Sequence, residues 1–284
     1  MRYIKRIQTP LSKQSKNNFK KESRVSEREH IDTHPASINL LGVSVYDLSK
    51  SDIVSSVIGK VIAGERAIFV YINIYAINLA QTLPWFRNFL NNASAAYCDG
   101  FGVLLGARMA GYRLIHRSTP PDWISDLASE CASRAITIFL LGGRSGVAER
   151  AALYLSQQHP GLRINGTHHG YFETTPGGAD NIKIIQAINQ TGSDLLLVGM
   201  GMPLQEKWLY ENWEHLNIKV ALPVGALLDY LGDEKNRPPH WMTNHGLEWT
   251  GRLFLEPGRL WKRYLLGIPH FFFLVFRQML GSGL

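Results

Sequence analysis

The sequence lacks the residues that a disulfide scaffold or a zinc site requires. Cys98 and Cys131 are the two cysteines among 284 residues, and no group of Cys and His has zinc-ligand spacing. These absences favour a reducing compartment such as the cytoplasm, where cysteines stay as free thiols.

Long apolar runs are also missing. The most apolar stretch, Tyr264–Phe276, has thirteen residues and is interrupted by Gly267 and Pro269, whereas a membrane-spanning helix needs about 20. Residues 1–38 contain no apolar core of a signal peptide. We therefore expect the stretch to lie on a membrane surface and not to cross the bilayer.

No D-x-D motif occurs, so the sequence does not indicate a carboxylate-held Mg²⁺ on a nucleotide diphosphate. An enzyme without that metal needs cationic side chains to stabilise a departing diphosphate. A solvated basic face or contact with lipid headgroups is the alternative role for such cations. The candidates are Arg237, Arg252, Arg259, Lys262 and Arg263.

The net charge of +7 is concentrated at the two ends of the chain. Residues 1–38 hold nine Lys/Arg against four Asp/Glu, and residues 252–284 hold five against one. Basic ends suit nucleic acid or an anionic membrane. The tail 1–38 is rich in Lys, Ser and Gln and has no hydrophobic period, so we expect it to be disordered.

From Ile38 the chain alternates between short apolar strand-like runs and longer helical segments. This pattern predicts an α/β fold with a mostly parallel, Rossmann-like sheet covered by helices on both faces. We expect a core domain over residues 39–240 and a C-terminal helical, membrane-proximal appendage over residues 241–284. The expected strands are Ile38–Val45, Ala67–Ile72, Ala95–Cys98, Ile136–Leu141, Leu162–Thr167, Asp194–Val198 and Ile218–Leu222; the expected helices are residues 50–63, 74–92, 100–111, 121–134, 145–158, 178–190 and 203–215.

Ligands of such sheets bind beyond the carboxyl ends of the strands, which draws attention to Asn73 and Asp99. Asp99 ends a strand before a Gly-flanked turn into a helix. A carboxylate there could act as a general base on an acceptor hydroxyl, and it could equally be an ordinary helix cap. The sequence around Asp99 alone leaves both roles open.

Two glycine-containing turns also follow predicted strands. Gly142 and Gly143 open a G-G-x-x-G turn, where backbone N–H groups could contact a phosphate, although plain turn chemistry gives the same pattern. The second turn runs from Gly199 to Glu206, with polar side chains at a helix start that could bind a base, ribose or sugar. The alternative is an ordinary strand-to-helix turn in which Glu206 lies favourably near the helix N-terminus. Asp229 and Arg237 belong to a polar cluster further along.

These segments resemble the WecG/TagA/CpsF glycosyltransferases over about residues 40–270. The order of an Asp-Gly motif and a G-x-G-x-P-x-Q-E motif is the most specific part of the likeness. The matching segments are Asn73–Asn78, Cys98–Val103, Arg117 with Asp122, Phe139–Gly143, His169–Phe172, Gly199–Glu206, Pro223–Ala226, Arg237–Pro239 and Leu247–Pro257.

The resemblance implies an inverting transferase that uses a UDP-sugar without a bound metal or cofactor. Asp99 falls on the proposed catalytic base of the family, and Arg252 and Arg259 on appendage arginines thought to close over the diphosphate. Lys262 replaces a third arginine, and the appendage is thought to meet the membrane. The residues assigned to the donor are Asn73, Gly142, Gly143, Gly199, Gly201, Pro203, Gln205, Glu206, Asp229 and Arg237; those assigned to the acceptor are Arg117 and Asp122; those assigned to the diphosphate are Arg252, Arg259, Lys262 and Arg263.

Two positions depart from the family pattern. Tyr71 stands where the family often has Thr, and Pro120 replaces the Gly of R-x-x-G-x-D. Because either change can alter the donor or acceptor site, glucose, N-acetylmannosamine and a uronic acid all stay open as the donor sugar.

We therefore expect transfer of a hexose-type sugar from UDP to an undecaprenyl-diphosphate-linked acceptor, for exopolysaccharide or another surface glycan. The enzyme would be peripheral on the cytoplasmic face of the bacterial inner membrane, with a homo-oligomer as the alternative use of the aromatic appendage. An NAD(P)-dependent oxidoreductase is one rival, although G-x-G-x-x-G is missing. A nucleic-acid-binding protein is the other, although the near-neutral core argues against it.

Overall fold

The computed structural model describes residues 37–232, 242 and 246–281. The strands are β1 (Ser37–Leu40), β2 (Val43–Tyr46), β3 (Ala67–Ile72), β4 (Ala95–Cys98), β5 (Thr137–Gly142), β6 (Arg163–His168), β7 (Leu195–Gly199) and β8 (Val220–Pro223). The helices are α2 (Lys50–Ala63), α3 (Ile74–Thr82), α4 (Pro84–Asn92), α5 (Phe101–Met109), α6 (Pro120–Ser133), α7 (Val147–Gln158), α8 (Ala179–Gln190), α9 (Leu204–Asn212), α10 (Leu227–Leu231), α12 (Glu248–Leu255), α13 (Pro257–Trp261) and α14 (Gly267–Gly281), with a 3₁₀ turn η1 (Trp213–His215) and a π-helical turn η2 (Lys262–Leu266).

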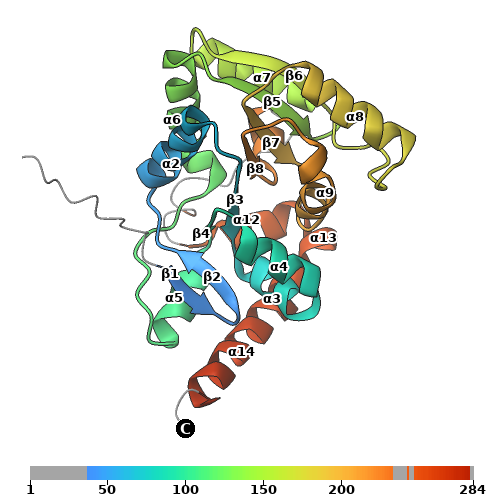
Figure 1. Cartoon of the computed structure of the whole chain (residues 1–284). Helices are drawn as coiled ribbons and strands as arrows, with labels where there is room; N and C mark the ends of the chain where they lie inside the picture. The colour runs from blue at the N-terminus through green and yellow to red at the C-terminus, as the bar shows by residue number, and fades with distance from the viewer. Residues whose placement is uncertain (1–36, 233–241, 243–245, 282–284) are drawn as a thin grey trace, which may run out of the picture. The chain divides into compact units, whose positions relative to one another are not determined.

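The eight strands form one sheet in the order β1-β2-β4-β3-β8-β7-β5-β6 (Figure 1). β1 and β2 pair antiparallel, and the other neighbours pair parallel. The predicted α/β class with a mostly parallel sheet is therefore confirmed.

Helices cover both faces of this sheet. Side chains alternate between the faces along each strand, so a strand of apolar residues makes both faces apolar and both need cover. On β3, Phe69 and Tyr71 join the core beneath α2, α6, α7 and α10. Ile68, Val70 and Ile72 of the same strand join the core beneath α3, α4, α5, α8, α9 and α14. Two separate apolar cores thus fix the positions of the strand ends.

Two predicted elements are divided in the structure. The strand expected over Ile38–Val45 is a hairpin, because the chain turns at Leu41 and Gly42, which both have positive φ. The helix expected over residues 74–92 is two helices, since α4 begins at Pro84, which supplies no N–H for a continuing helix.

The C-terminal apolar helix is longer than the sequence indicated. In the described part of the chain, Lys262–Gly281 forms 20 helical residues that are long and apolar enough to cross a membrane by length and composition, and 11% of the apolar window is buried. The expectation that this stretch is too short was wrong, because the helix continues past Arg277. The π-helical turn η2 ends three residues before Pro269, and it contains Leu265, whose carbonyl would clash with the proline ring in a regular α-helix.

Contacts along its length hold α14 against the core (Figure 1). Asn78 Nδ2 of α3 donates to the Gly267 carbonyl at 2.7 Å. Phe271 and Val275 are buried against α5. Gln278 Oε1 near the end of α14 accepts the Leu41 N–H at 3.0 Å. The predicted appendage therefore packs directly on the sheet-covering helices, while the domain boundary predicted at residue 240 lies outside the described residues.

Candidate active site

Asn73 and Asp99 lie side by side because they follow two neighbouring parallel strands. Ile72 of β3 pairs with Cys98 of β4, so the next residue of each strand emerges at the same edge of the sheet. Asn73 caps α3 by accepting the Ala76 N–H at 3.0 Å, and its Nδ2 donates to Asp99 Oδ2 at 3.4 Å. The two residues, each singled out in the sequence because it follows a strand, therefore lie side by side at one edge of the sheet.

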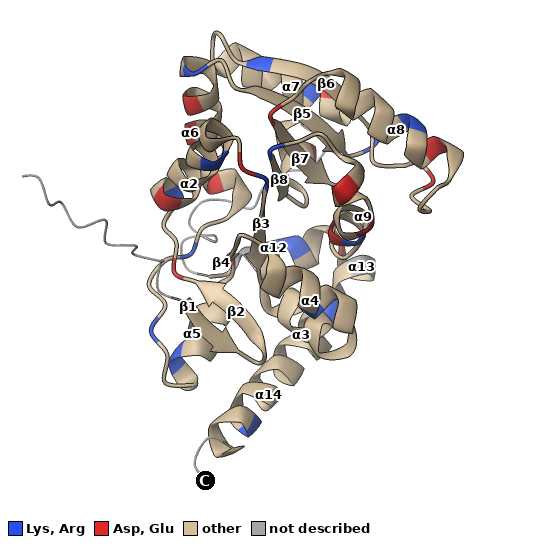
Figure 2. Cartoon of the chain, in the orientation of Figure 1, with Lys and Arg blue, Asp and Glu red and all other residues tan. Residues whose placement is uncertain are grey.

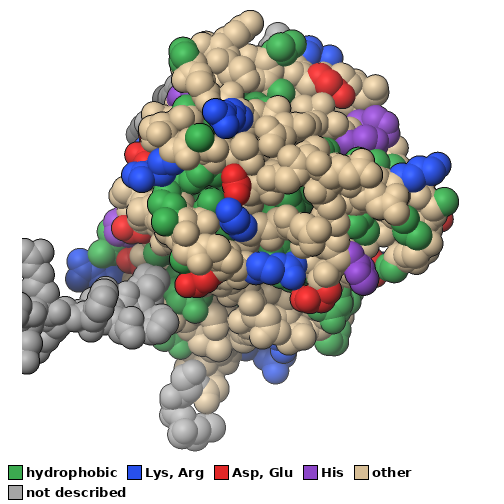
Figure 3. Space-filling view, turned by 45° about the horizontal axis from the view of Figure 1, so that its top comes forward, with side chains coloured by type: hydrophobic (Ala, Val, Ile, Leu, Met, Phe, Trp, Pro, Cys, Tyr) green, Lys and Arg blue, Asp and Glu red, His purple; other side chains and the backbone are tan. Residues whose placement is uncertain are grey.

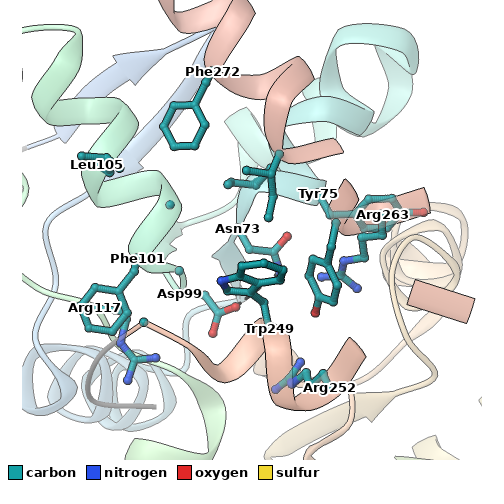
Figure 4. A pocket seen from close by; sticks show the side chains of 16 residues that line it. Asn73, Tyr75, Asp99, Phe101, Leu105, Arg117, Trp249, Arg252, Arg263 and Phe272 are labelled. Atoms are coloured by element: carbon teal, nitrogen blue, oxygen red, sulfur yellow. Dashed lines mark hydrogen bonds between the residues drawn. The ribbon is translucent and has the colours of Figure 1, made fainter. Parts of the chain in front are cut away.

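Asp99 does not cap the helix that follows it. Gly100 occupies the N-cap position of α5, and no side chain caps that helix. The carboxylate of Asp99 instead borders a pocket of about 340 Å³ (Figure 4). The helix-cap alternative is therefore wrong, and Asp99 lines the pocket.

The pocket is built by the ends of β3 and β4, by α5 and by the C-terminal helices. Its volume is in the range of small-molecule sites. The described residues that line it are Asn73, Ile74, Tyr75, Asp99, Gly100, Phe101, Gly102, Leu105, Arg117, Gly246, Trp249, Arg252, Arg263, Tyr264, Ile268 and Phe272.

Arg117 is fixed in the pocket by two contacts. Its guanidinium lies 4.9 Å from the centre of the Phe101 ring, and its Nη2 is 3.5 Å from Asp122 Oδ2. Asp122 also accepts the Thr119 N–H at 3.3 Å at the start of α6, and it does not line the pocket. Arg117 therefore lines the pocket, and Asp122 lies behind it.

Pro120 preserves this arrangement despite its departure from the family pattern. It is the first residue of α6, where a missing N–H costs no helical hydrogen bond. The Gly→Pro change is thus compatible with the Arg117–Asp122 contact.

The predicted diphosphate cations fall into three groups. Arg252 and Arg263 line the pocket, and the Arg263 guanidinium lies 4.5 Å from the Tyr75 ring centre. Lys262 is exposed, lies 5.6 Å from the ring of Trp261 and does not line the pocket. Arg259 belongs to α13, but its side chain is outside the description, as is the whole of Arg237.

The glycine turns pack tightly against one another and do not line this pocket. A Cβ at Gly142 would lie 2.3 Å from the Gly199 carbonyl oxygen, and Gly143 N–H donates to that same oxygen at 3.1 Å. The close approach of the two backbones therefore explains why Gly142 and Gly199 carry no side chain. Gly201 differs, because its φ of +82° requires glycine while the space beside it is open.

Gln205 is the centre of a buried hydrogen-bond network. Its Oε1 accepts the N–H groups of Gly201 and Gly225 at 3.2 and 3.1 Å. Its Nε2 donates to Tyr71 OH at 3.1 Å and to Glu206 Oε1 at 2.8 Å. The amide thereby uses its two donors and accepts two bonds, so we infer that Gln205 holds the two loops together and does not reach for a ligand.

Glu206 and Tyr71 are ionisable groups inside this network. Burial raises the pKa of Glu206 to about 7, and burial together with the nearby charges of Glu206 and Asp99 raises the pKa of Tyr71. Glu206 Oε2 has no hydrogen-bond partner. Tyr71, the other departure from the family pattern, thus fills this site with a hydroxyl that accepts from Gln205.

The remaining predicted donor residues lie outside the pocket. Pro203 is the N-cap residue of α9, and Asp229 lies on α10. The described residues contain no group of three or more His, Cys, Asp or Glu that could hold a metal ion. Independence from metal stays a prediction.

No separate signal in the sequence marked the aromatic and apolar residues of the pocket. Tyr75, Phe101, Leu105 and Phe272 sit on helices, where such side chains are typical of a core. They are recognised only once α14 lies against α5 and places them around Asp99.

Comparison with known proteins agrees with the resemblance noted in the sequence. The glycosyl transferase WecG/TagA/CpsF family model matches residues 38–283. An N-acetylglucosaminyldiphosphoundecaprenol N-acetyl-beta-D-mannosaminyltransferase of Bacillus subtilis (strain 168) is 30% identical over 66% of this chain and 71% of its own length. A protein of the same description from Staphylococcus aureus (strain MRSA252) is 26% identical over 86% and 93%. The chain therefore belongs to the WecG/TagA/CpsF family of glycosyltransferases.

Proposed function

We propose that this protein transfers a hexose-type sugar from a UDP-sugar to a hydroxyl of a saccharide carried on undecaprenyl diphosphate. The observation that carries the proposal is the position of Asp99 between two sets of cations. In Figure 4, Arg117 lies on one side of Asp99, and Arg252 and Arg263 lie on the other. The reaction joins two molecules that each carry a diphosphate, and the pocket offers cations to both.

In this proposal Asp99 takes the proton of the acceptor hydroxyl as that oxygen attacks the anomeric carbon of the donor. The carbon–oxygen bond to UDP breaks as the new glycosidic bond forms on the opposite face, so the configuration inverts. Arg252 and Arg263 stabilise the negative charge that develops on the departing diphosphate. Asn73 orients the Asp99 carboxylate through the contact between its Nδ2 and Oδ2.

The relatives favour N-acetylmannosamine as the first donor to test, because their described activity transfers that sugar. Glucose and a uronic acid form the comparison arms, since Tyr71 and Pro120 depart from the family pattern. The glycan to which the product contributes, exopolysaccharide or another surface polymer, follows from the acceptor that is used.

We also propose that the enzyme works as a peripheral protein on the cytoplasmic face of the inner membrane, with a docking face on η2 and α14. Contacts from Gly267 to Gln278 tie one side of α14 to the core, which supports a helix that lies on the membrane surface. Its other side exposes large apolar residues, which suits burial at the lipid interface. The docking face consists of Leu265, Leu266, Phe273, Met279 and Leu280.

The distribution of charge also supports a membrane-facing side at α5 and α14. Residues 100–117 and 257–281, which contain α5 and α14, hold Arg and Lys but no Asp or Glu. Figure 2 shows basic and no acidic colour on these two helices, whereas the face in Figure 3 carries both signs. Anionic lipid headgroups attract segments that carry cations and no acids.

The test is UDP release by the full chain with a panel of UDP-sugars, with and without a polyprenyl-diphosphate-linked N-acetylglucosamine acceptor. We expect release that requires the acceptor, that is fastest with one sugar, and that persists in EDTA. The Asp99→Asn variant is the background control. UDP release at the same rate with and without the acceptor would overturn the proposal. Loss of UDP release in EDTA with rescue by Mg²⁺ would overturn metal independence alone.

A further inference from the structure

Two rows of apolar side chains leave the pocket along neighbouring helices. Within each row the residues are four positions apart, so they lie on one face of their helix. The rows are Phe101, Leu105 and Met109 on α5, and Ile268, Phe272 and Phe276 on α14.

The two rows begin side by side. The first two members of each row border the same pocket as Asp99. Beyond the pocket, α5 and α14 stay in contact, because Gly106 leaves room for Phe271: a Cβ at Gly106 would lie 2.4 Å from Phe271 Cζ. Figure 4 shows Leu105 and Phe272 at the end of the pocket opposite Arg252. We call the apolar end of the pocket, together with the exposed Met109 and Phe276 beyond it, the apolar groove.

The groove is apolar where a soluble surface would be polar. Leu105 is 51% exposed, Met109 is 37% exposed and Phe276 is 52% exposed. At its inner end the groove meets the Arg117 guanidinium, which lies over the Phe101 ring. A cation thus stands at the junction between the polar site and the apolar rows.

We propose that this groove binds the first isoprene units of the acceptor's polyprenyl chain, with Arg117 contacting the diphosphate at the head of that chain. The inference rests on the proposed function and assigns the lipid part of the acceptor to α5 and α14. Eight residues separate the first and last members of each row, so the groove is about 12 Å long. Only the head of a long polyprenyl chain fits, and the remainder stays in the bilayer.

The change from a cation to apolar side chains along the groove favours the polyprenyl-linked acceptor over the nucleotide sugar as its occupant. A nucleotide sugar is polar along its whole length and gains nothing from two rows of exposed apolar side chains. A lipid-linked diphosphate changes from anionic to apolar at one bond, as the groove changes from Arg117 to Leu105. Acyl chains of the surrounding bilayer carry no diphosphate at that junction, and the test separates them.

Transfer kinetics test the groove in solution without a membrane. One acceptor carries N-acetylglucosamine diphosphate on a farnesyl group, and the other carries it on a methyl group. We expect Leu105→Gln to raise the KM for the farnesyl acceptor about tenfold more than it raises the KM for the methyl acceptor. The matched control is Leu153→Gln on α7, an equally conservative change at a leucine that is 63% exposed and far from the groove in sequence. An equal effect of Leu105→Gln on both acceptors, or none on either, would overturn the proposal.

Binding without donor gives a second readout that does not need activity. Calorimetry should show that farnesyl diphosphate binds the wild-type chain more tightly than inorganic diphosphate does, and that Leu105→Gln removes most of this preference. Sugar transfer without any preference for the farnesyl acceptor would reject the proposed groove and leave the proposed function in place. A farnesyl preference in a chain that transfers no sugar would leave the groove in place and reject the proposed function.

Discussion

At the scale of single residues, the proposed reaction depends most on Asp99. We expect Asp99→Asn to lower kcat by roughly 10²–10⁴-fold, because an amide cannot take the proton of the acceptor hydroxyl. The shape of the side chain and its place beside Asn73 are kept, so the donor KM and the melting temperature should stay close to wild type. A steady-state assay and a thermal melt check this, and a variant that keeps most of its rate would remove Asp99 from the mechanism.

Glu206 gives a prediction about pH. The folded protein keeps its proton up to about pH 7, whereas the unfolded chain loses it near the ordinary value of 4.5. The unfolded state therefore binds fewer protons across this interval, and the free energy of unfolding falls as pH rises from 4.5 to 7. The loss is on the order of 3 kcal/mol.

Glu206→Gln removes this titration. Relative to wild type, the variant should gain stability as the pH rises from 5 to 8, which urea denaturation at both values measures. The control is Glu149→Gln on α7, whose exposed carboxyl is in contact with water in both states. Parallel stability profiles for wild type and Glu206→Gln would contradict the prediction.

The sequence located part of the site for a clear physical reason. Residues after parallel strands meet at one edge, which is why Asn73 and Asp99 were each singled out from the sequence; that the two are neighbours came from the structure. The role of Gln205 could not be found in the same way. A glutamine at a helix start looks like a ligand contact, and only the positions of Gly201, Gly225 and Tyr71 show that its amide is already bonded.

At the scale of elements, the contact between α5 and α14 rests on the absence of a side chain at Gly106. We expect Gly106→Ala to lower the free energy of unfolding by about 1–3 kcal/mol, because its Cβ would overlap the buried Phe271 ring. Gly59→Ala on α2 is the matched control: nothing lies within 4 Å of its Cβ, so better helix propensity should stabilise it by about 0.5–1 kcal/mol. Chemical denaturation compares the two variants. A stabilised Gly106→Ala would show that α14 can shift away from α5 without loss of stability.

Element types were predictable from the sequence, and their interruptions were less so. The apolar run ends before Arg277 in the sequence, but the helix continues to Gly281. In this last part of the helix, Gln278 accepts a hydrogen bond from the Leu41 N–H of the hairpin. That bond joins residues 237 positions apart. No local pattern reports such a contact, so the length of α14 was underestimated.

At the scale of the whole molecule, the basic helices α5 and α14 should control membrane binding. Arg108 on α5 and Arg277 on α14 are both exposed. Each cation near an anionic surface contributes about 1 kcal/mol, so the double change Arg108→Gln with Arg277→Gln should weaken binding to phosphatidylserine vesicles roughly thirtyfold. Vesicle sedimentation at low and high salt measures this, and added salt should reduce the difference.

The control is Arg163→Gln, an exposed arginine on β6 at the opposite edge of the sheet from the β1–β2 hairpin. It should bind the vesicles like wild type. Equal binding of all variants, or equal binding to neutral and anionic vesicles, would show that charge does not orient the protein.

The helix α14 provides one wall of the pocket and also carries the docking face, and this double use has a kinetic consequence. An acceptor in the proposed groove reaches Asp99 by sideways diffusion within the leaflet, without entering the water. The rate should then follow the number of acceptor molecules per unit area of membrane. Adding inert lipid at a constant total amount of acceptor would slow the enzyme, even though every bulk concentration stays the same.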